Sequence, residues 1–206
     1  MFDNENLRVE ALKNFLYRYQ NLIFLLVLAI LVGVFGTRYW LHRQQKIAEN
    51  ISLSYTQLLN LRSDKKPEEA KLIAEQIIKD HPKSIYAVFS ALLLAKDAVI
   101  NKDYANAEKQ LNFALKNSNR SPELRELICL RLGRVLLEER KADEVLSLIN
   151  GDKHQFFAAN WHELEGDAYM QLDKLSEAEQ SYRKAAELEK TDLDSSMLLY
   201  LKLQQF

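Results

Sequence analysis

Few residues in this sequence have the type and spacing that chemistry requires, and the most suggestive are His162, Glu163 and Glu165. His162 and Glu165 are three positions apart, so on a helix they share one face and could supply two ligands to a metal ion. A protein metal site needs three or four ligands, however, and this pair falls short. We interpret these side chains as ordinary surface or hairpin-seam residues.

Other catalytic signatures are missing from the sequence. Cys129 is its one cysteine, which rules out an intramolecular disulfide framework and a zinc site built on cysteines. Its position inside the apolar segment 127–132 indicates a buried small side chain rather than a reactive thiol. The sequence has no glycine-rich phosphate loop, no His-Glu-x-x-His helix and no Gly-x-Ser-x-Gly elbow. It therefore predicts a protein that is not an enzyme and that holds no cofactor or metal.

The elements that position these residues are predicted to be helices. Five glycines and three prolines in 206 residues leave little turn chemistry for a sheet, while Leu, Ala, Glu, Lys and Gln favour helix. The 28 basic and 29 acidic residues nearly balance, so no field of one sign attracts a nucleic acid. We expect an all-α fold and no nucleic-acid partner.

One segment near the start is apolar enough to enter a lipid bilayer. No charged residue occurs from 19 to 37, and these 19 residues would form a helix of roughly 28 Å, close to the thickness of the hydrocarbon core. Tyr19, Arg38, Tyr39 and Trp40 flank it as membrane-interface anchors. A buried core helix and a cleaved signal peptide are the alternatives, disfavoured by the length of the apolar run and by the lack of a cleavage site. The sequence predicts one transmembrane helix over 19–37.

The charge pattern leaves the orientation of this helix open. Arg8, Lys13 and Arg18 precede it, and three basic residues also follow it within about twenty positions, so the positive-inside count is a tie. Residues 1–18 form a short amphipathic segment, and 38–61 continue as a juxtamembrane helix running into the first repeat. The rest, 62–206, reads as short helices separated by turns. Ser121 before Pro122 is a typical helix start, with a capping hydroxyl and then a proline.

These short helices follow the tetratricopeptide pattern. Gly166 and Tyr169 on one helix precede Ala178, Tyr182 and Ala185 on the next, which matches the repeat's order of small and aromatic residues. Earlier copies are weaker, and the positions that should be small on the second helices are spaced 37, 38 and 33 residues apart. Those positions are Ala70, Ala107, Val145 and Ala178. Small first-helix residues at Ala95, Gly133 and Gly166 complete the expected repeat packing. We expect an α-solenoid of about four divergent hairpins, with 193–203 as a capping helix.

The first helices of such an array line a concave face, and the predicted face is largely apolar. The candidate protein-binding groove consists of Phe89, Leu92, Lys96, Val99, Leu127, Leu130, Arg134, Leu137 and Met170. An exposed apolar stripe there would bind hydrophobic peptide, whereas the same residues packed by a tight superhelix would be plain core. Both interpretations stay open, with Leu130 expected in the core and Phe89 partly exposed.

The full length of the chain resembles the YfgM family of ancillary SecYEG translocon subunits. The resemblance is carried by residues 10–15 (EALKNF), 36–40 (GTRYW), 52–55 (SLSY), 130–135 (LRLGRV) and 166–168 (GDA). It implies a single-pass bacterial inner-membrane protein with a cytoplasmic N-terminus and a tetratricopeptide-like periplasmic domain. It also implies three kinds of partner: the SecYEG translocon, a membrane-anchored periplasmic chaperone of the prolyl-isomerase type, and unfolded exported proteins. The alternative is a membrane-tethered scaffold that organises another envelope or division complex.

Overall fold

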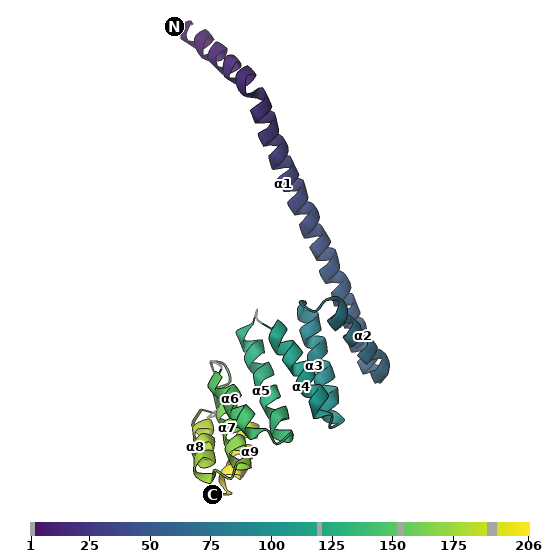
Figure 1. Cartoon of the computed structure of the whole chain (residues 1–206), viewed down its shortest axis with the longest axis vertical. Helices are drawn as coiled ribbons and strands as arrows, with labels where there is room; N and C mark the ends of the chain where they lie inside the picture. Colours follow the sequence, from purple (N-terminus) through teal and green to yellow (C-terminus); the bar gives the residue numbers. More distant parts are fainter. Residues whose placement is uncertain (1–2, 119–120, 152–154, 189–192) are drawn as a thin grey trace. The chain divides into compact units, whose positions relative to one another are not determined.

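The computed structural model describes residues 3–118, 121–151, 155–188 and 193–206. Secondary structure in these ranges is α-helical, without strands (Figure 1). The chain divides into two compact units, Met1–Asn50 and Ile51–Phe206. Helix α1 (Asp3–Ser63) supplies the described part of the first unit and also begins the second.

The first unit contains residues 19–37, the segment predicted to cross a membrane. Among the residues with a described placement, no helix is long and apolar enough to cross a membrane. Within the predicted span, the side chains of residues 20, 22–23, 26–27 and 29 lie outside the described ones, as do those of 3–16 in the preceding amphipathic segment. The structure therefore does not confirm the prediction of a transmembrane helix over 19–37.

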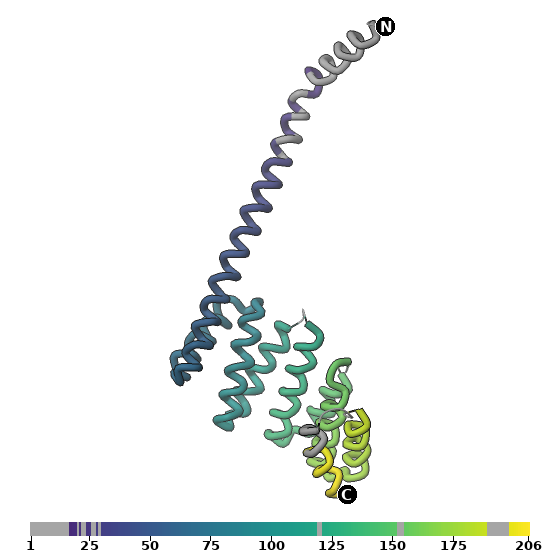
Figure 2. Tube along the Cα trace, turned by 180° about the vertical axis from the view of Figure 1, so that it is seen from behind, coloured from purple at the N-terminus to yellow at the C-terminus, as the bar shows by residue number. Residues whose placement is uncertain are grey.

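The second unit is a series of helical hairpins. After the end of α1 come α2 (Pro67–Asp80), α3 (Ile85–Ile100), α4 (Tyr104–Asn117), α5 (Pro122–Glu138), α6 (Ala142–Gly151), α7 (Ala158–Gln171), α8 (Leu175–Leu188) and α9 (Leu193–Leu203). From α2 onward each helix packs on the next, and α5 also contacts α7, as the two opposite views show (Figures 1 and 2). The helices therefore pair in order, with α3 and α4, α5 and α6, and α7 and α8 each forming a hairpin. Hairpins stacked in this way form an α-solenoid.

The turn inside each hairpin has one recurring geometry. Three residues separate the two helices, and the middle one has a positive φ between 57° and 63°. These residues are Lys65, Lys102, Arg140 and Asp173. At the second turn, Lys102 N–H donates to the Val99 carbonyl and Asp103 N–H to the Ala98 carbonyl, at 3.0 and 2.8 Å. The other three turns repeat this pair of bonds, which defines a Schellman motif that satisfies the last carbonyls of the first helix.

The positive-φ residues have the same spacing along the chain as the small second-helix positions, 37, 38 and 33 residues. Each lies five residues before its small residue, and the four small residues are buried. The second helix of every hairpin therefore starts from the same turn and presents its small residue at the same place. Helix starts between hairpins are capped by side chains, as at Ser121, whose Oγ accepts a hydrogen bond from Leu124 N–H at 3.2 Å.

Among the described residues, two groups of buried side chains join the helices from α3 onward. The larger one joins α3 to α7 and includes Leu111, Ile128, Val145 and Leu164. The smaller one, at the C-terminal end, joins Tyr182 of α8 to Leu199 of α9. Burial of these side chains supplies the main favourable term for folding, at roughly 25 cal/mol per Å² of apolar surface.

Candidate protein-interaction groove

A groove with a volume of ≈ 640 Å³ is lined by side chains of α3, α4 and α5. Its apolar part comes mainly from α3, where Val99 and Ile100 are 39 % and 68 % exposed. Leu92, Leu93 and Val135 extend the same surface. An isolated exposed aliphatic residue is unremarkable, but a cluster of them in a concave surface is typical of a binding site.

The charged part of the groove is mostly basic. Lys96 of α3 and Arg131 and Arg134 of α5 line it with exposed side chains, and none of the three forms an ion pair or hydrogen bond with another described residue. Glu138 is the acidic side chain in the lining, and its Oε2 accepts a hydrogen bond from Tyr104 Oη at 3.2 Å. Desolvation and this hydrogen bond raise the pKa of Tyr104. The groove therefore offers an apolar surface beside three cations without partners.

The structure brings only part of the predicted groove together. Leu92, Lys96, Val99 and Arg134 line it, but Leu130 is 3 % exposed and belongs to the core. The remaining predicted groove residues are half-buried outside the lining: Phe89, Leu127, Leu137 and Met170. The Phe89 ring lies 6.2 Å from that of Tyr55, and Met170 packs against the C-terminal buried group.

Sequence reasoning included Arg134 but did not include Arg131, Val135 and Glu138, which line the same groove. Leu130 packs into the core, which turns the neighbouring face, with Arg131 and Arg134, toward the open side. The spacing of 131, 134, 135 and 138 is that of one helix face, so this signal was present in the sequence. The face with Leu127, Leu130 and Leu137 is more apolar, so the sequence gave no reason to prefer the face with Arg131, Val135 and Glu138.

Two glycines lie where neighbouring helices come close. A Cβ on Gly133 would lie 2.5 Å from Leu164 Cδ2, and one on Gly166 would overlap the ring of Tyr182. The other predicted packing residues Ala95, Ala107, Ala178 and Ala185 are buried, whereas Tyr169 is half-buried. These small residues let adjacent helices approach closely.

The Tyr182 ring is fixed by polar contacts. Its Oη donates to Asp167 Oδ1 at 2.7 Å, and desolvation followed by this hydrogen bond raises its pKa well above the ordinary value. Lys202 of α9 donates to the same carboxylate at 2.6 Å and to Glu163 Oε1 at 2.8 Å. The capping helix is thus attached to α7 by charge as well as by apolar packing.

A buried carboxylate that sequence reasoning did not single out organises the start of α7. Glu126 of α5 is 5 % exposed and accepts hydrogen bonds from the backbone N–H groups of Gln155, Phe156 and Phe157, at 3.0 to 3.3 Å. The indole Nε1–H of Trp161 also donates to it, at 2.8 Å. Burial alone would raise the pKa of Glu126, but these donors lower it below its ordinary value. Glu126 therefore acts as a helix cap supplied by another hairpin.

The His162 cluster forms a polar seam between α7 and α8. His162 Nδ1 lies 3.2 Å from Glu165 Oε2, which also accepts a hydrogen bond from Ser181 Oγ at 3.0 Å. Across the described part of the chain, no group of three or more His, Cys, Asp or Glu side chains could hold a metal ion. Cys129 is fully buried. The structure gives these residues packing and hydrogen-bonding roles.

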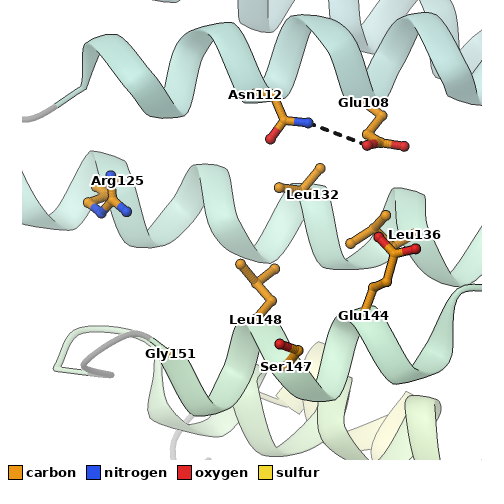
Figure 3. A pocket seen from close by; sticks show the side chains of 9 residues that line it. All are labelled: Glu108, Asn112, Arg125, Leu132, Leu136, Glu144, Ser147, Leu148 and Gly151. Carbon is orange, nitrogen blue, oxygen red and sulfur yellow. Dashed lines mark hydrogen bonds between the residues drawn. The ribbon is translucent and has the colours of Figure 1, made fainter.

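A second hollow, of ≈ 450 Å³, lies between α4, α5 and α6 (Figure 3). Two of its polar side chains, Asn112 and Glu108, already bind one another. Asn112 Nδ2 donates to Glu108 Oε1 at 3.4 Å, and Lys141 Nζ donates to Glu108 Oε2 at 2.8 Å. The Lys141 ammonium lowers the pKa of Glu108. Because the Glu108 carboxylate is already paired with Lys141, this hollow is a weaker candidate for binding than the groove beside α3.

The four predicted membrane-interface anchors lie in the first unit. Tyr19, Arg38, Tyr39 and Trp40 are all exposed there.

The stacked hairpins and the small residues at their close approaches define a fold of the tetratricopeptide class. In agreement, residues 13–206 match the family described as a tetratricopeptide repeat-like domain. The "Ancillary SecYEG translocon subunit" of Haemophilus influenzae is 34 % identical over 74 % of each chain. The proteins of that name from Escherichia coli K12 and Neisseria gonorrhoeae are 29 % and 28 % identical, over 82 % and 94 % of this chain and 81 % and 94 % of theirs. The chain belongs to this family of ancillary SecYEG translocon subunits with a tetratricopeptide repeat-like domain.

A solved structure gives independent evidence for the fold. The "MamA RS-1 ArsTM double mutant" superposes with a TM-score of 0.57 at 17 % identity, covering 75 % of this chain and 93 % of that one. At that identity the similarity concerns the fold alone.

Proposed function

We propose that this chain is a non-enzymatic ancillary subunit of the Sec translocon and that its hairpin array holds partner proteins there. The observation that carries the proposal is the agreement between the name shared by its relatives and a fold that supplies a groove. The groove contains aliphatic and basic side chains, which suits binding to another protein chain. The residues that bind the partner are those of the groove beside α3.

The proposal includes an attachment to the inner membrane. Residues 19–37 cross it once, the segment 1–18 is cytoplasmic, 38–61 leads out of the membrane and 62–206 is periplasmic. Support comes from the uncharged run between 19 and 37 and from the membrane location of a translocon. The flanking anchors Tyr39 and Trp40 have the amphipathic rings that are enriched at the headgroup level.

We further propose that the array connects the translocon to periplasmic chaperones for newly exported proteins. The partners in this arrangement are a membrane-anchored chaperone of the prolyl-isomerase type and the unfolded exported chains themselves. The family resemblance in residues 36–40 and 130–135 motivates this step, and the exposed apolar groove is compatible with it.

Purification of the tagged full-length chain from membranes in a mild detergent tests the proposal. The SecYEG subunits should co-purify in near-constant ratio, and the prolyl-isomerase chaperone should appear with them. A tagged single-span membrane protein of unrelated sequence, expressed to the same level, serves as the control. Recovery of the intact chain without SecYEG would contradict the translocon role, and recovery of SecYEG without the chaperone would contradict only the chaperone link.

A further inference from the structure

We propose that the groove beside α3 selects an apolar segment of a partner protein that carries carboxylates, and that it rejects basic segments. This inference rests on the proposed function in one respect, that the array binds another protein chain. It adds the chemistry by which that partner is recognised.

The first step concerns the apolar surface of the groove. Ile100 and Val99 stand at the end of α3 with much of their side chains in water, beside the half-buried Leu92 and Leu93. Covering these aliphatic groups would gain roughly 25 cal/mol for each Å² of apolar surface removed from water. An occupant therefore needs aliphatic or aromatic side chains.

The second step concerns charge. Lys96 on α3 faces the groove from one side, and Arg131 and Arg134 on α5 from the other. In the described residues no carboxylate neutralises them, since Asp97, next to Lys96, is paired with Arg62. Glu138 is engaged by the Tyr104 hydroxyl. The lining therefore carries three cations against one carboxylate.

The balance of charge favours an acidic occupant. A guanidinium presents a planar fork that matches a carboxylate, so Arg131 and Arg134 suit glutamate, aspartate or a chain-terminal carboxylate. A basic segment would meet like charges from both sides, which suppresses binding more strongly than a missing attraction does. The occupant that satisfies both steps alternates apolar and acidic side chains.

Three fluorescent peptides that differ only in charge can test this selectivity on the full-length chain in detergent micelles. Each has twelve residues with leucine at alternate positions, and the positions between carry Glu, Gln or Lys. Anisotropy titrations should give an affinity for the Glu peptide roughly tenfold above that for the Gln peptide, as expected for two or three exposed ion pairs. The Lys peptide should bind more weakly still, and 0.5 M salt should reduce the preference for Glu.

Charge reversal localises the effect. In the R131E/R134E variant the Glu peptide should lose about tenfold or more in affinity and the Lys peptide should gain. The matched control is K109E/K116E, which reverses two exposed lysines of α4 outside the groove lining and should bind as the parent does. I100S removes an exposed aliphatic side chain and should weaken all three peptides alike. Circular dichroism melts establish that every variant is folded.

Several outcomes would overturn the inference. Equal affinities for the three peptides, no binding of any of them, or an unchanged Glu-peptide affinity in R131E/R134E would each do so. Self-association of the chain that R131E/R134E abolishes would assign the groove to a second copy instead. Co-purification of SecYEG with the parent chain is scored separately, so the proposed function can stand while this selectivity fails, and the reverse.

Discussion

Glu126 shows how one charged residue can be buried and still support the fold. Its carboxylate takes up three backbone N–H groups ahead of α7, where Phe157 occupies the cap position without a side-chain cap of its own. These three donors precede the first turn of α7, and a carboxylate close to a helix N-terminus is also favoured by the helix dipole. The residue joins α5 to the connection that leads into the last hairpin.

We expect Glu126→Gln to destabilise the hairpin array by about 2 to 3 kcal/mol. The amide removes the charge and turns an N–H donor toward groups that are themselves donors, which leaves a buried polar group unsatisfied. Urea denaturation of residues 51–206, which form a compact unit, measures the effect. Glu144→Gln, an exposed change on α6, is the control and should stay within about 0.5 kcal/mol of the parent. A Glu126→Gln protein as stable as this control would show that the cap is dispensable.

The same substitution should change the response to acid. The pKa of Glu126 is lowered in the folded protein, so its stabilisation is complete above the unfolded value near 4.5 and is lost as pH falls below that value. The gap in stability between parent and Glu126→Gln should therefore shrink as pH falls from 7 to about 3.5. Both proteins should also lose some stability in acid through Glu108, because Lys141 lowers the pKa of that residue as well. This loss is common to both and does not change the gap between them. A gap that stays constant over this range would contradict the assignment.

The two packed glycines should differ in their tolerance of alanine. At Gly166 the new Cβ would overlap the Tyr182 ring, which Asp167 holds in place, so we expect Gly166→Ala to cost about 1 to 3 kcal/mol. The gain of about 1 kcal/mol in helix propensity applies at both sites, but at Gly133 the new Cβ meets a terminal methyl group of Leu164, which can shift more easily than a ring, so we expect a smaller net cost there. Thermal melts of the two variants side by side test this ranking. If Gly133→Ala proved the more damaging, the expectation that the end of the Leu164 side chain yields more easily than the Tyr182 ring would be wrong.

At the scale of elements, the four hairpin turns combine regular geometry with residues that are poorly suited to it. Lys65, Lys102, Arg140 and Asp173 adopt the left-handed conformation that glycine adopts without strain. None of the chain's glycines has a positive φ among the described residues. The Schellman hydrogen bonds hold these turns in place despite the cost of a Cβ there.

We therefore expect Lys102→Gly to stabilise the array by about 0.5 to 1 kcal/mol, because it removes left-handed strain at a position that is exposed. Asn101→Gly is the matched comparison. Asn101 precedes it in the same turn with φ −84°, so glycine there relieves no strain and should lower the stability or leave it unchanged. The midpoints of urea denaturation give the comparison. Equal effects of the two substitutions would mean that the turn geometry carries no measurable strain.

Much of the helical array could be predicted from the sequence because its signals are local. Ser121 and Pro122 mark a helix start, and Ser121 caps α5 as that pair predicts. The rotation of α5 could not be predicted in the same way. Leu130 and Val135 are both apolar and both buried, and only packing decides that Val135, beside Arg131 and Arg134, also borders the groove. Glu126 was missed because its hydrogen-bond partners lie 29 to 35 residues further along the chain.

At the scale of the whole molecule, the basic residues on the two sides of 19–37 balance, so topology must be measured. We expect alkaline phosphatase fused after Phe206 to be active, since the proposal places the array in the periplasm, where that enzyme folds. The same enzyme fused after residue 18 should be inactive. Activity assays with immunoblots for fusion levels provide the measurement. A stable but inactive fusion at Phe206 would contradict the proposed orientation.

Four polar contacts between hairpins join residues that have nearly the same separation in the sequence. Separations of 35, 33, 34 and 35 residues occur for Arg62 with Asp97, Lys141 with Glu108, Gln171 with Leu137, and Lys202 with Asp167. Each contact therefore joins a repeat to its neighbour. Because each hairpin docks on the repeat before it, such an array can grow one hairpin at a time from a nucleus at its N-terminal end. Under the proposed topology, in which the array is exported, the first hairpins could therefore pack before the C-terminus has been delivered.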